Sequence, residues 1–341
     1  MANTIFPLLR LPETPRHHVL KSMNYIELTS YSLLSRKAKS LIKSLKIQAS
    51  KILVNFRESS LILHVWIQDL DDFEITMFEI ENLNSESLKL NVEQPCKEVS
   101  VCIYPDLSPE SQKMKTPPLS IERWIQHLSL IFNCCEPPHL NFNSELEVFD
   151  TRSIRKAIPE ISGLTIGTLE AYGRKILQLF LSDSRCGELR LECDPFVNEP
   201  PVTFQRVGIQ NLNDVEFCCS KIVLNHLLTF NFHYINICQD AYVSIKDINS
   251  FIKSWIKGSN PKLKWIRSAL NEASNEETVL KGILYEVVPE TTERPFRHKG
   301  SEIISFIKGG FDVRNKKGIT ANIQMINFEG LGSILHIYIL E

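Results

Sequence analysis

Residues 6–45 read FPLLRLPETPRHHVLKSMNYIELTSYSLLSRKAKSLIKSL, and they combine an apolar lead-in with a dense helical pattern. Pro7 and Pro12 lack backbone N–H donors, so they keep the apolar run between them out of a regular helix. After this run the sequence predicts three short helices, at 13–23, 26–31 and 33–45. Thr14 is placed to cap the first helix, and Pro15 suits its first turn. The chain therefore begins with a small helical unit that offers large apolar side chains.

The third of these helices carries an apolar stripe with helical period. Its members fall at offsets 0, 4, 7, 8 and 11, and they are Leu34, Ala38, Leu41, Ile42 and Leu45. A unit of about forty residues buries only a limited fraction of its apolar surface. Each leucine of the segment that becomes buried against another surface contributes roughly 1.5 to 3 kcal/mol to the free energy of that contact. The segment therefore needs a partner or docks onto the rest of the chain, and an ordinary three-helix cap on a larger domain is the alternative.

The order and spacing of these residues resemble the F-box. The matching positions are Leu11-Pro12, Val19-Leu20 with Met23, Glu27-Leu28, and Ser32-Leu33-Leu34-Ser35 followed by Arg36-Lys37. Two positions depart from the pattern: Pro15 stands where an apolar helix residue is usual, and Ala38 where tryptophan is common. The resemblance implies an F-box over residues 1–46 that binds a Skp-family adaptor. The residues implied in this contact are Leu8, Leu9, Leu11, Pro12, Val19, Leu20, Met23, Ile26, Leu28, Leu33 and Leu34.

Composition predicts a globular intracellular protein. With 341 residues, 43% of them hydrophobic, the chain can bury a substantial core in one large or two modest domains. A net charge of -2 gives no reason to expect nucleic acid or a membrane as partner. The nine cysteines form an odd set without a CxxC pair, which favours reduced thiols in the cytoplasm and/or nucleus. No apolar run approaches the roughly 20 residues that span a bilayer.

The pattern changes to strands after residue 46. Residues 47–118 are expected to form antiparallel strand hairpins and a polar loop, with strands at 52–56, 61–67, 73–80 and 99–104. Residues 271–341 form a C-terminal β-rich segment, with strands at 283–288, 303–313, 319–326 and 334–340. Residues 314–318, RNKKG, fit a hairpin turn. We expect these C-terminal strands to pair with those of residues 52–80.

Residues 119–270 carry a coarse repeat. Short strands are predicted to start at residues 140, 164, 189, 215, 235 and 263, and intervals of this size suit stacked strand-and-helix units. Helices are predicted at 120–132, 175–181 and 244–257. Ser244 and Asp247 form the start of the last helix, and Gly258 its stop. The repeat has no fixed Asn or Cys ladder, so it fits either an irregular leucine-rich-repeat-like α/β region or an irregular α/β layer.

Residues 251–263, FIKSWIKGSNPKL, add a second resemblance. They are similar to the helix, Trp, Gly, Asn-Pro and Leu signature of the type 2 F-box-associated region, which accompanies F-boxes in a nematode-expanded family. This region would cover about residues 190–270. The fold class that we expect is α/β, with a small three-helix F-box, the leucine-rich-like α/β region and additional antiparallel strands.

The sequence contains no catalytic signature: GxSxG, GxxxxGK[ST], GxGxxG and HExxH are all missing. Cys134 and Cys135 with His139 lack a fourth zinc ligand at a suitable spacing, so buried thiols are the expectation. We therefore expect no catalytic residue, no cofactor and no metal.

The two resemblances imply a substrate-recruiting adaptor subunit of a Skp-cullin-F-box-type ubiquitin ligase, which is not itself an enzyme. The F-box would reach a cullin-RING ligase through the Skp-family adaptor, and the C-terminal region would hold a protein substrate. Candidate substrate contacts are the outward residues of the repeat strands, namely Asn141, Asn143, Arg190, Glu192, Asn236 and Lys264. The alternatives are an enzyme with a site built from non-contiguous residues, and a scaffold that does not promote degradation.

Overall fold

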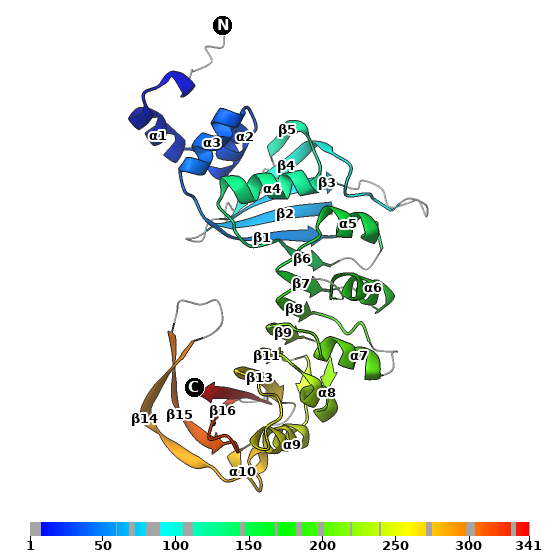
Figure 1. Ribbon diagram of the computed structural model, residues 1–341, viewed down its shortest axis with the longest axis vertical. Coiled ribbons are helices and arrows are strands. Elements are labelled where there is room, and N and C mark those ends of the chain that lie inside the picture. The colour runs from blue at the N-terminus through cyan, green and yellow to red at the C-terminus, as the bar shows by residue number, and fades with distance from the viewer. Residues whose placement is uncertain are drawn as a thin grey trace. The chain divides into compact units, whose positions relative to one another are not determined.

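The protein, seen here as a computed structural model, divides into two compact units, Met1–Gly163 and Leu164–Glu341. Helices and strands mix in both units (Figure 1), which confirms the α/β class. The four-part domain division stays a prediction. The structure describes residues 8–58, 60–67, 72–79, 89–104, 112–143, 147–167, 170–181, 186–196, 201–218, 220–238, 240–270, 275–297, 304–328 and 332–340.

The first unit opens with the three expected helices, after a single 3-10 turn at Leu8–Arg10. The helices are α1 (Glu13–Lys21), α2 (Tyr25–Ser32) and α3 (Arg36–Ser44). The expected Thr14 cap is wrong, because α1 begins at Glu13 and Pro12 occupies the N-cap position. Helix α2 has a true capping box, in which Asn24 and Glu27 each accept a backbone N–H at 2.9 Å.

Helix α3 starts later than the apolar stripe predicts. The Ser35 side chain caps the helix by accepting the Ala38 N–H, so Leu34 precedes the helix and its side chain is 75% exposed. The rest of the stripe faces inward: Ala38 and Ile42 are buried, and Leu41 is half-buried. Leu34 is therefore available to a partner and contributes nothing to the core.

The three helices share a core with the strands and helix that follow them. The Tyr25 ring stacks on Phe73 at 6.0 Å and meets the edge of Phe132 at 6.1 Å. The buried hydroxyl of Ser32 in α2 lies 2.7 Å from Nε2 of His127 in α4 (Ile121–Ile131). The helical segment thus docks onto the rest of its own unit, which was one of the two possibilities that its small size left open.

His127 makes the stability of this contact depend on pH. Burial, and next the nearby Lys39, lower the pKa of His127 from 6.5 to about 4. Between about pH 4 and pH 6.5, His127 is protonated in the unfolded chain and neutral in the folded one. The free energy of unfolding therefore falls as the pH drops from about 6.5 toward about 4. We expect this loss to reach about 3 kcal/mol, measured by urea denaturation across the window. His127→Gln should remove that part of the slope, and equal slopes in the two proteins would contradict the assignment.

The strands of the first unit form a mixed sheet. Its antiparallel order is β1 (Ala49–Phe56), β2 (Ser60–Ile67), β3 (Asp72–Glu79), β4 (Cys96–Tyr104) and β5 (Gln112–Leu119). On its other side β1 pairs in parallel with β6 (His139–Phe142). The sequence missed helix α5 (Thr151–Ala157) and also strand β5, whose Pro117 and Pro118 suit only a sheet edge. Helix α4 begins after Ser120, as predicted.

Parallel strands form the centre of the second unit. The pairings run from β8 (Glu188–Leu191) through β9 (Asp214–Phe217) and β11 (Tyr234–Ile237) to β13 (Trp265–Leu270). Strand β7 (Gly163–Ile166) lies at the boundary of the units, and β10 (Lys221–Ile222) and β12 (Tyr242–Val243) are two-residue strands. Strands β7, β8, β9, β11 and β13 start within two residues of the predicted positions, whereas β10 and β12 were not predicted. The finer prediction of leucine-rich-like geometry stays a prediction.

Helices connect the parallel strands. They are α6 (Glu170–Leu181), α7 (Pro201–Gly208), α8 (Leu224–Thr229) and α9 (Ile245–Ile256), and Figure 1 shows α7, α8 and α9 on one side of the strands. Helix α9 confirms the predicted start at Ser244, whose hydroxyl accepts the Asp247 N–H. The sequence did not identify α7 or α8.

The C-terminal strands extend this sheet. They are β14 (Glu286–Arg297), β15 (Ile304–Arg314), β16 (Thr320–Phe328) and β17 (Gly332–Leu340), and they follow a short helix α10 (Glu276–Val279). The expected pairing with residues 52–80 is wrong, because β17 pairs with β16 on one side and with β13 on the other. The predicted turn before Gly318 is confirmed, since Gly318 has φ +81° and β15 pairs with β16 across it.

The signature after α9 has a structural role. Gly258 takes φ +107°, a conformation that glycine adopts without strain, and it ends α9. Asn260 is 9% exposed, and its amide Nδ2 donates to the carbonyl oxygens of Leu227 and Phe230, both at 2.8 Å. Asn260 therefore ties the end of α8 to the segment that leads into β13.

We expect Asn260→Ala to lower the free energy of unfolding by about 2 to 4 kcal/mol. Two buried carbonyls lose their donor, at about 1 to 3 kcal/mol each, and alanine tolerates the φ of +49° at this position poorly. Urea denaturation measures the loss. Asn211→Ala, at an exposed asparagine of the same unit, is the control and should change stability by no more than about 0.5 kcal/mol. Equal effects of the two substitutions would contradict this role.

Candidate ligand-binding surface

A row of polar side chains crosses the parallel strands of the second unit. Arg190, Glu216, Asn236 and Arg267 occupy matching register positions on β8, β9, β11 and β13. Their neighbours along the strands are buried and point into the core; they are Leu189, Leu191, Val215, Phe217, Ile235, Ile237, Ile266 and Ser268. Because side chains alternate between the faces of a strand, the polar row lies on the opposite face, where its members are exposed or half-buried.

Hydrogen bonds link the whole row. Arg190 donates from Nη1 to Glu216 Oε2 at 3.1 Å and from Nε to Glu192 Oε1 at 3.0 Å. Asn236 Nδ2 donates to Glu216 Oε1 at 3.0 Å, and its Oδ1 accepts from Arg267 Nη1 at 3.0 Å. A connected network of this kind fixes the orientation of each side chain. The row therefore presents an ordered array of donors and acceptors with a guanidinium near each end.

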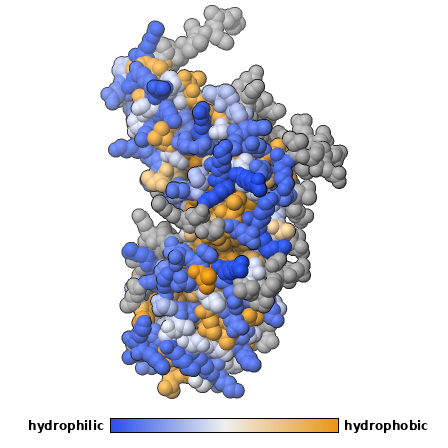
Figure 2. Space-filling model, turned by 45° about the vertical axis from the view of Figure 1, so that its right-hand side comes forward, coloured by the Kyte–Doolittle hydropathy of each residue, from blue (hydrophilic) through white to orange (hydrophobic). Residues whose placement is uncertain are grey.

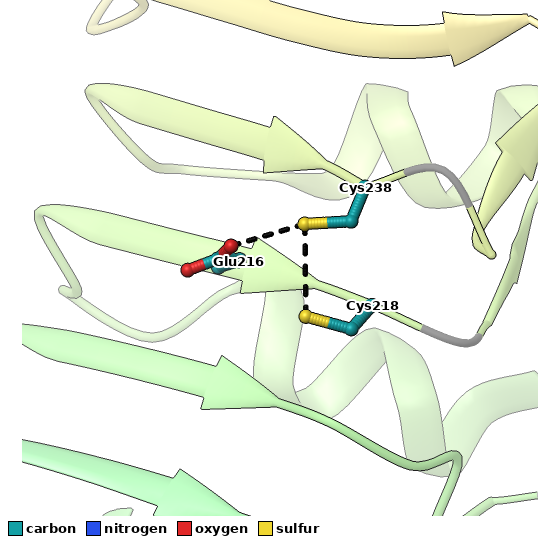
Figure 3. A group of neighbouring side chains, drawn as sticks. All are labelled: Glu216, Cys218 and Cys238. Atoms are coloured by element: carbon teal, nitrogen blue, oxygen red, sulfur yellow. Dashed lines mark hydrogen bonds between the residues drawn. The ribbon is translucent and has the colours of Figure 1, made fainter.

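Two thiols lie next to this row, directly after β9 and β11. Cys218 and Cys238 have their sulfur atoms 3.6 Å apart, and the Cys238 thiol donates to Glu216 Oε1 at 3.0 Å (Figure 3). Burial raises the pKa of both thiols, and the Glu216 carboxylate raises the pKa of Cys238 further. Thiols with raised pKa values are protonated at neutral pH and are poor nucleophiles. Burial therefore favours the neutral thiol form of both cysteines.

A basic cavity of 740 Å³ lies in the same unit. The cations that line it are Lys262, Lys264, Arg294, Arg314 and Lys317. Arg294 is committed to Asp312, whose two carboxylate oxygens it contacts at 2.8 Å, and Asn322 donates to the same carboxylate at 3.0 Å. Arg294 matches the charge of Asp312, and Arg314 lies 3.7 Å from a carboxylate oxygen of Glu286. The three lysines of the lining still give the cavity a positive charge, so it suits an anionic ligand.

The candidate substrate residues fall into three places. Arg190 and Asn236 belong to the polar row, Glu192 contacts Arg190 next to the row, and Lys264 lines the basic cavity. Asn141 and Asn143 belong to the first unit; Asn141 donates to the Asn55 side chain at 2.9 Å, and Asn143 is exposed. Sequence reasoning missed Glu216, Arg267, Cys218 and Cys238. The signal that could have found the first two is their position directly after a buried residue in each repeat strand, as for Arg190 and Asn236.

The candidate adaptor residues differ in exposure. Leu8, Leu20 and Leu28 are buried, so they act through the packing of the helices. Leu11, Val19, Met23, Ile26 and Leu33 are half-buried, and Leu9, Pro12 and Leu34 are exposed. On the face that Figure 2 shows, hydrophilic residues predominate and hydrophobic ones form patches. Leu9 and Leu34 are the leucines of this set that a protein partner can reach without disturbing the packing of the helices.

Comparison with known families finds both of the expected regions, the F-box and the F-box associated region. The family model described as F-box domain matches residues 8–49, and the one described as F-box associated matches residues 203–268. Both resemblances inferred from the sequence are thus confirmed, and the chain carries the domain combination of an F-box adaptor in the ubiquitin-ligase context. The F-box associated region includes Glu216, Asn236 and Arg267 of the polar row, and also Asn260.

One relative can be named. The chain is 25% identical over 273 residues to the F-box associated domain-containing protein sdz-33 of Caenorhabditis elegans, a stretch that covers 79% of this chain and 81% of that protein. No solved structure matches the chain.

Proposed function

We propose that this chain recruits a protein substrate to a Skp-cullin-F-box-type ubiquitin ligase. The F-box binds a Skp-family adaptor and reaches a cullin-RING ligase through it, while the second unit holds the substrate. The single observation that carries this proposal is the F-box at residues 8–49 followed by the F-box associated region at 203–268. The exposed Leu9 and Leu34 support it, because they offer the apolar contact that a constant partner needs.

The polar row is the surface that suits a specific substrate. Its side chains come from separate strands, so each can vary without disturbing the core, as in repeat proteins with a strand-lined binding face. Parallel strands that start at residues 188, 214, 234 and 265 support the leucine-rich-like interpretation of this region. A protein surface with alternating charge and hydrogen-bonding groups would match the row.

On this proposal the chain is not itself an enzyme, and ubiquitin is transferred by other subunits of the ligase. The raised thiol pKa values of Cys218 and Cys238 support this view against a cysteine-based active site. We also propose that the chain works in the cytoplasm and/or nucleus, since the cysteines described by the structure form no disulfide. Among the described residues, no helix is long and apolar enough to cross a membrane.

Affinity capture of the full chain, followed by mass spectrometry, tests the function. We expect a Skp-family adaptor and a cullin among the captured proteins. Proteasome inhibition should raise the level of the other captured proteins, because they would escape degradation. Capture of adaptor and cullin with no such rise would favour a non-degradative scaffold, and capture of neither would contradict the proposal.

A further inference from the structure

Three side chains on β9 and just after β9 and β11 place soft and hard metal-binding atoms close together. Glu216, Cys218 and Cys238 each offer one such atom, and these atoms all lie within 4.8 Å of one another (Figure 3). We propose that they form a binding site for Zn²⁺ at the edge of the polar row. This site goes beyond substrate recruitment, and the absence of a CxxC spacing hid it from sequence reasoning.

The distances suit zinc. A tetrahedral Zn²⁺ with Zn–S bonds of about 2.3 Å holds two thiolate sulfurs about 3.8 Å apart, and a carboxylate oxygen about 3.5 Å from each sulfur. In the structure the two sulfurs are 3.6 Å apart, and Cys238 Sγ lies 3.0 Å from Glu216 Oε1. The metal would replace the thiol protons and open the sulfur-oxygen contact by about half an ångström. A side-chain rotation supplies that shift.

The backbone holds the two cysteines in place. Cys218 N–H donates to the Leu191 carbonyl and Cys238 N–H to the Phe217 carbonyl, both at 2.8 Å, so the parallel ladder continues through both residues. The thiols therefore sit at the carboxyl ends of adjacent parallel strands, where α/β folds commonly place ligands. Little chain entropy remains to be lost when a metal binds.

Positive charge lies next to the site. Two thiolates and a carboxylate carry three negative charges; Zn²⁺ offsets two of them, and the Arg190 guanidinium, which Glu192 also contacts, offsets part of the third. Arg190 bonds Glu216 Oε2, and so it orients the carboxylate with Oε1 toward the thiols. Such a second partner commonly fixes a metal ligand. Three protein ligands leave a fourth position open, for water or for a side chain of a bound protein.

Zinc titration of the reduced full chain tests the proposal. The chain is first stripped of metal with a chelator and kept reduced with a phosphine. Competition with a chromophoric chelator then measures the Zn²⁺ affinity. In a separate titration, the charge-transfer absorption of Co²⁺ reports whether thiolates bind the metal. We expect the full chain to bind a single tight Zn²⁺. Cys218→Ser and Cys238→Ser should each weaken binding about 100-fold, and Glu216→Gln about 10-fold or more. Cys135→Ser, at an exposed cysteine of the first unit, is the control and should keep the full affinity.

A second measurement needs no substitution. Alkylation of the native chain, read by peptide mass spectrometry, should show that Zn²⁺ protects Cys218 and Cys238 but leaves Cys135 reactive. The proposal is overturned if Zn²⁺ protects neither thiol of the pair, if Co²⁺ gives no thiolate band, or if the two cysteines are recovered as a disulfide that persists under the reductant.

Discussion

A chain with Leu34→Asp is expected to capture a Skp-family adaptor about 100-fold more weakly than the unchanged chain, while it remains folded. Leu34 is 75% exposed and precedes the Ser35 cap of α3, so the substitution removes no core contact. At an interface the same residue would lose roughly 1.5 to 3 kcal/mol of apolar burial and force a carboxylate out of water. A total near 2.7 kcal/mol corresponds to about 100-fold in Kd. Surface plasmon resonance with purified adaptor measures it.

The control for this substitution is Leu284→Asp. Leu284 is 95% exposed in the second unit, so the change has the same chemistry at a leucine outside the F-box. Thermal unfolding should be unchanged for both variants. Leu8 is a poor choice for such a test, because it is buried and its loss would disturb the packing of the helices. Full adaptor affinity in the Leu34→Asp chain would show that the adaptor does not bind at this residue.

Local signals in the sequence predicted the elements that local chemistry decides. Helix α9 was predicted at both ends because Ser244 and Gly258 act on the adjacent backbone. The start of α3 was misplaced because Leu34 fits the apolar period while the Ser35 cap decides the boundary. Strand β5 was missed because Pro117 and Pro118 argue against a strand. In the structure β5 nevertheless pairs with the antiparallel strand β4.

The candidate site needed information that no single segment contains. Arg190 and Asn236 could be predicted as outward residues from strand alternation alone. Their connection through Glu216 depends on the register of three parallel strands, which is a tertiary property. The thiol pair is an intermediate case: Cys218 and Cys238 are 20 residues apart, which equals the interval between the starts of β9 and β11. Comparing equivalent positions of successive repeats would have aligned them.

A segment of about forty residues is too small to bury its own apolar surface, and its size alone does not decide between a partner and the rest of the chain. Tyr25 and Ser32 show that part of the apolar surface of the segment is buried against Phe73, Phe132 and His127 of the same unit. Removal of residues 1–46 would therefore expose this core. Substitution of an exposed side chain is the cleaner way to separate adaptor binding from folding.

We expect Arg267→Glu to reduce capture of substrate proteins about 10-fold or more, with adaptor binding unchanged. Arg267 anchors one end of the polar row through its bond to Asn236 Oδ1, and it is half-buried. A charge reversal here breaks that bond and presents like charge to any acidic group of the substrate, which costs at least about 1.4 kcal/mol. Quantitative mass spectrometry of captured proteins, normalised to the adaptor, measures the effect. Arg267 reaches the proposed zinc ligand Glu216 only through Asn236, so the zinc affinity of the Arg267→Glu chain is measured as well, to separate a loss of substrate from a loss of metal.

Two further variants identify the surface involved. Arg206→Glu reverses an exposed arginine on helix α7 of the same unit, and it should leave the captured set unchanged. Lys317→Glu reverses a charge that lines the basic cavity without touching the polar row. If substrate is lost with Lys317→Glu and kept with Arg267→Glu, the cavity is the recruiting surface and the substrate contact is anionic. If substrate is lost with Arg267→Glu and kept with Lys317→Glu, the polar row is the recruiting surface. A substrate bound only through acidic groups would instead depend on the positively charged cavity.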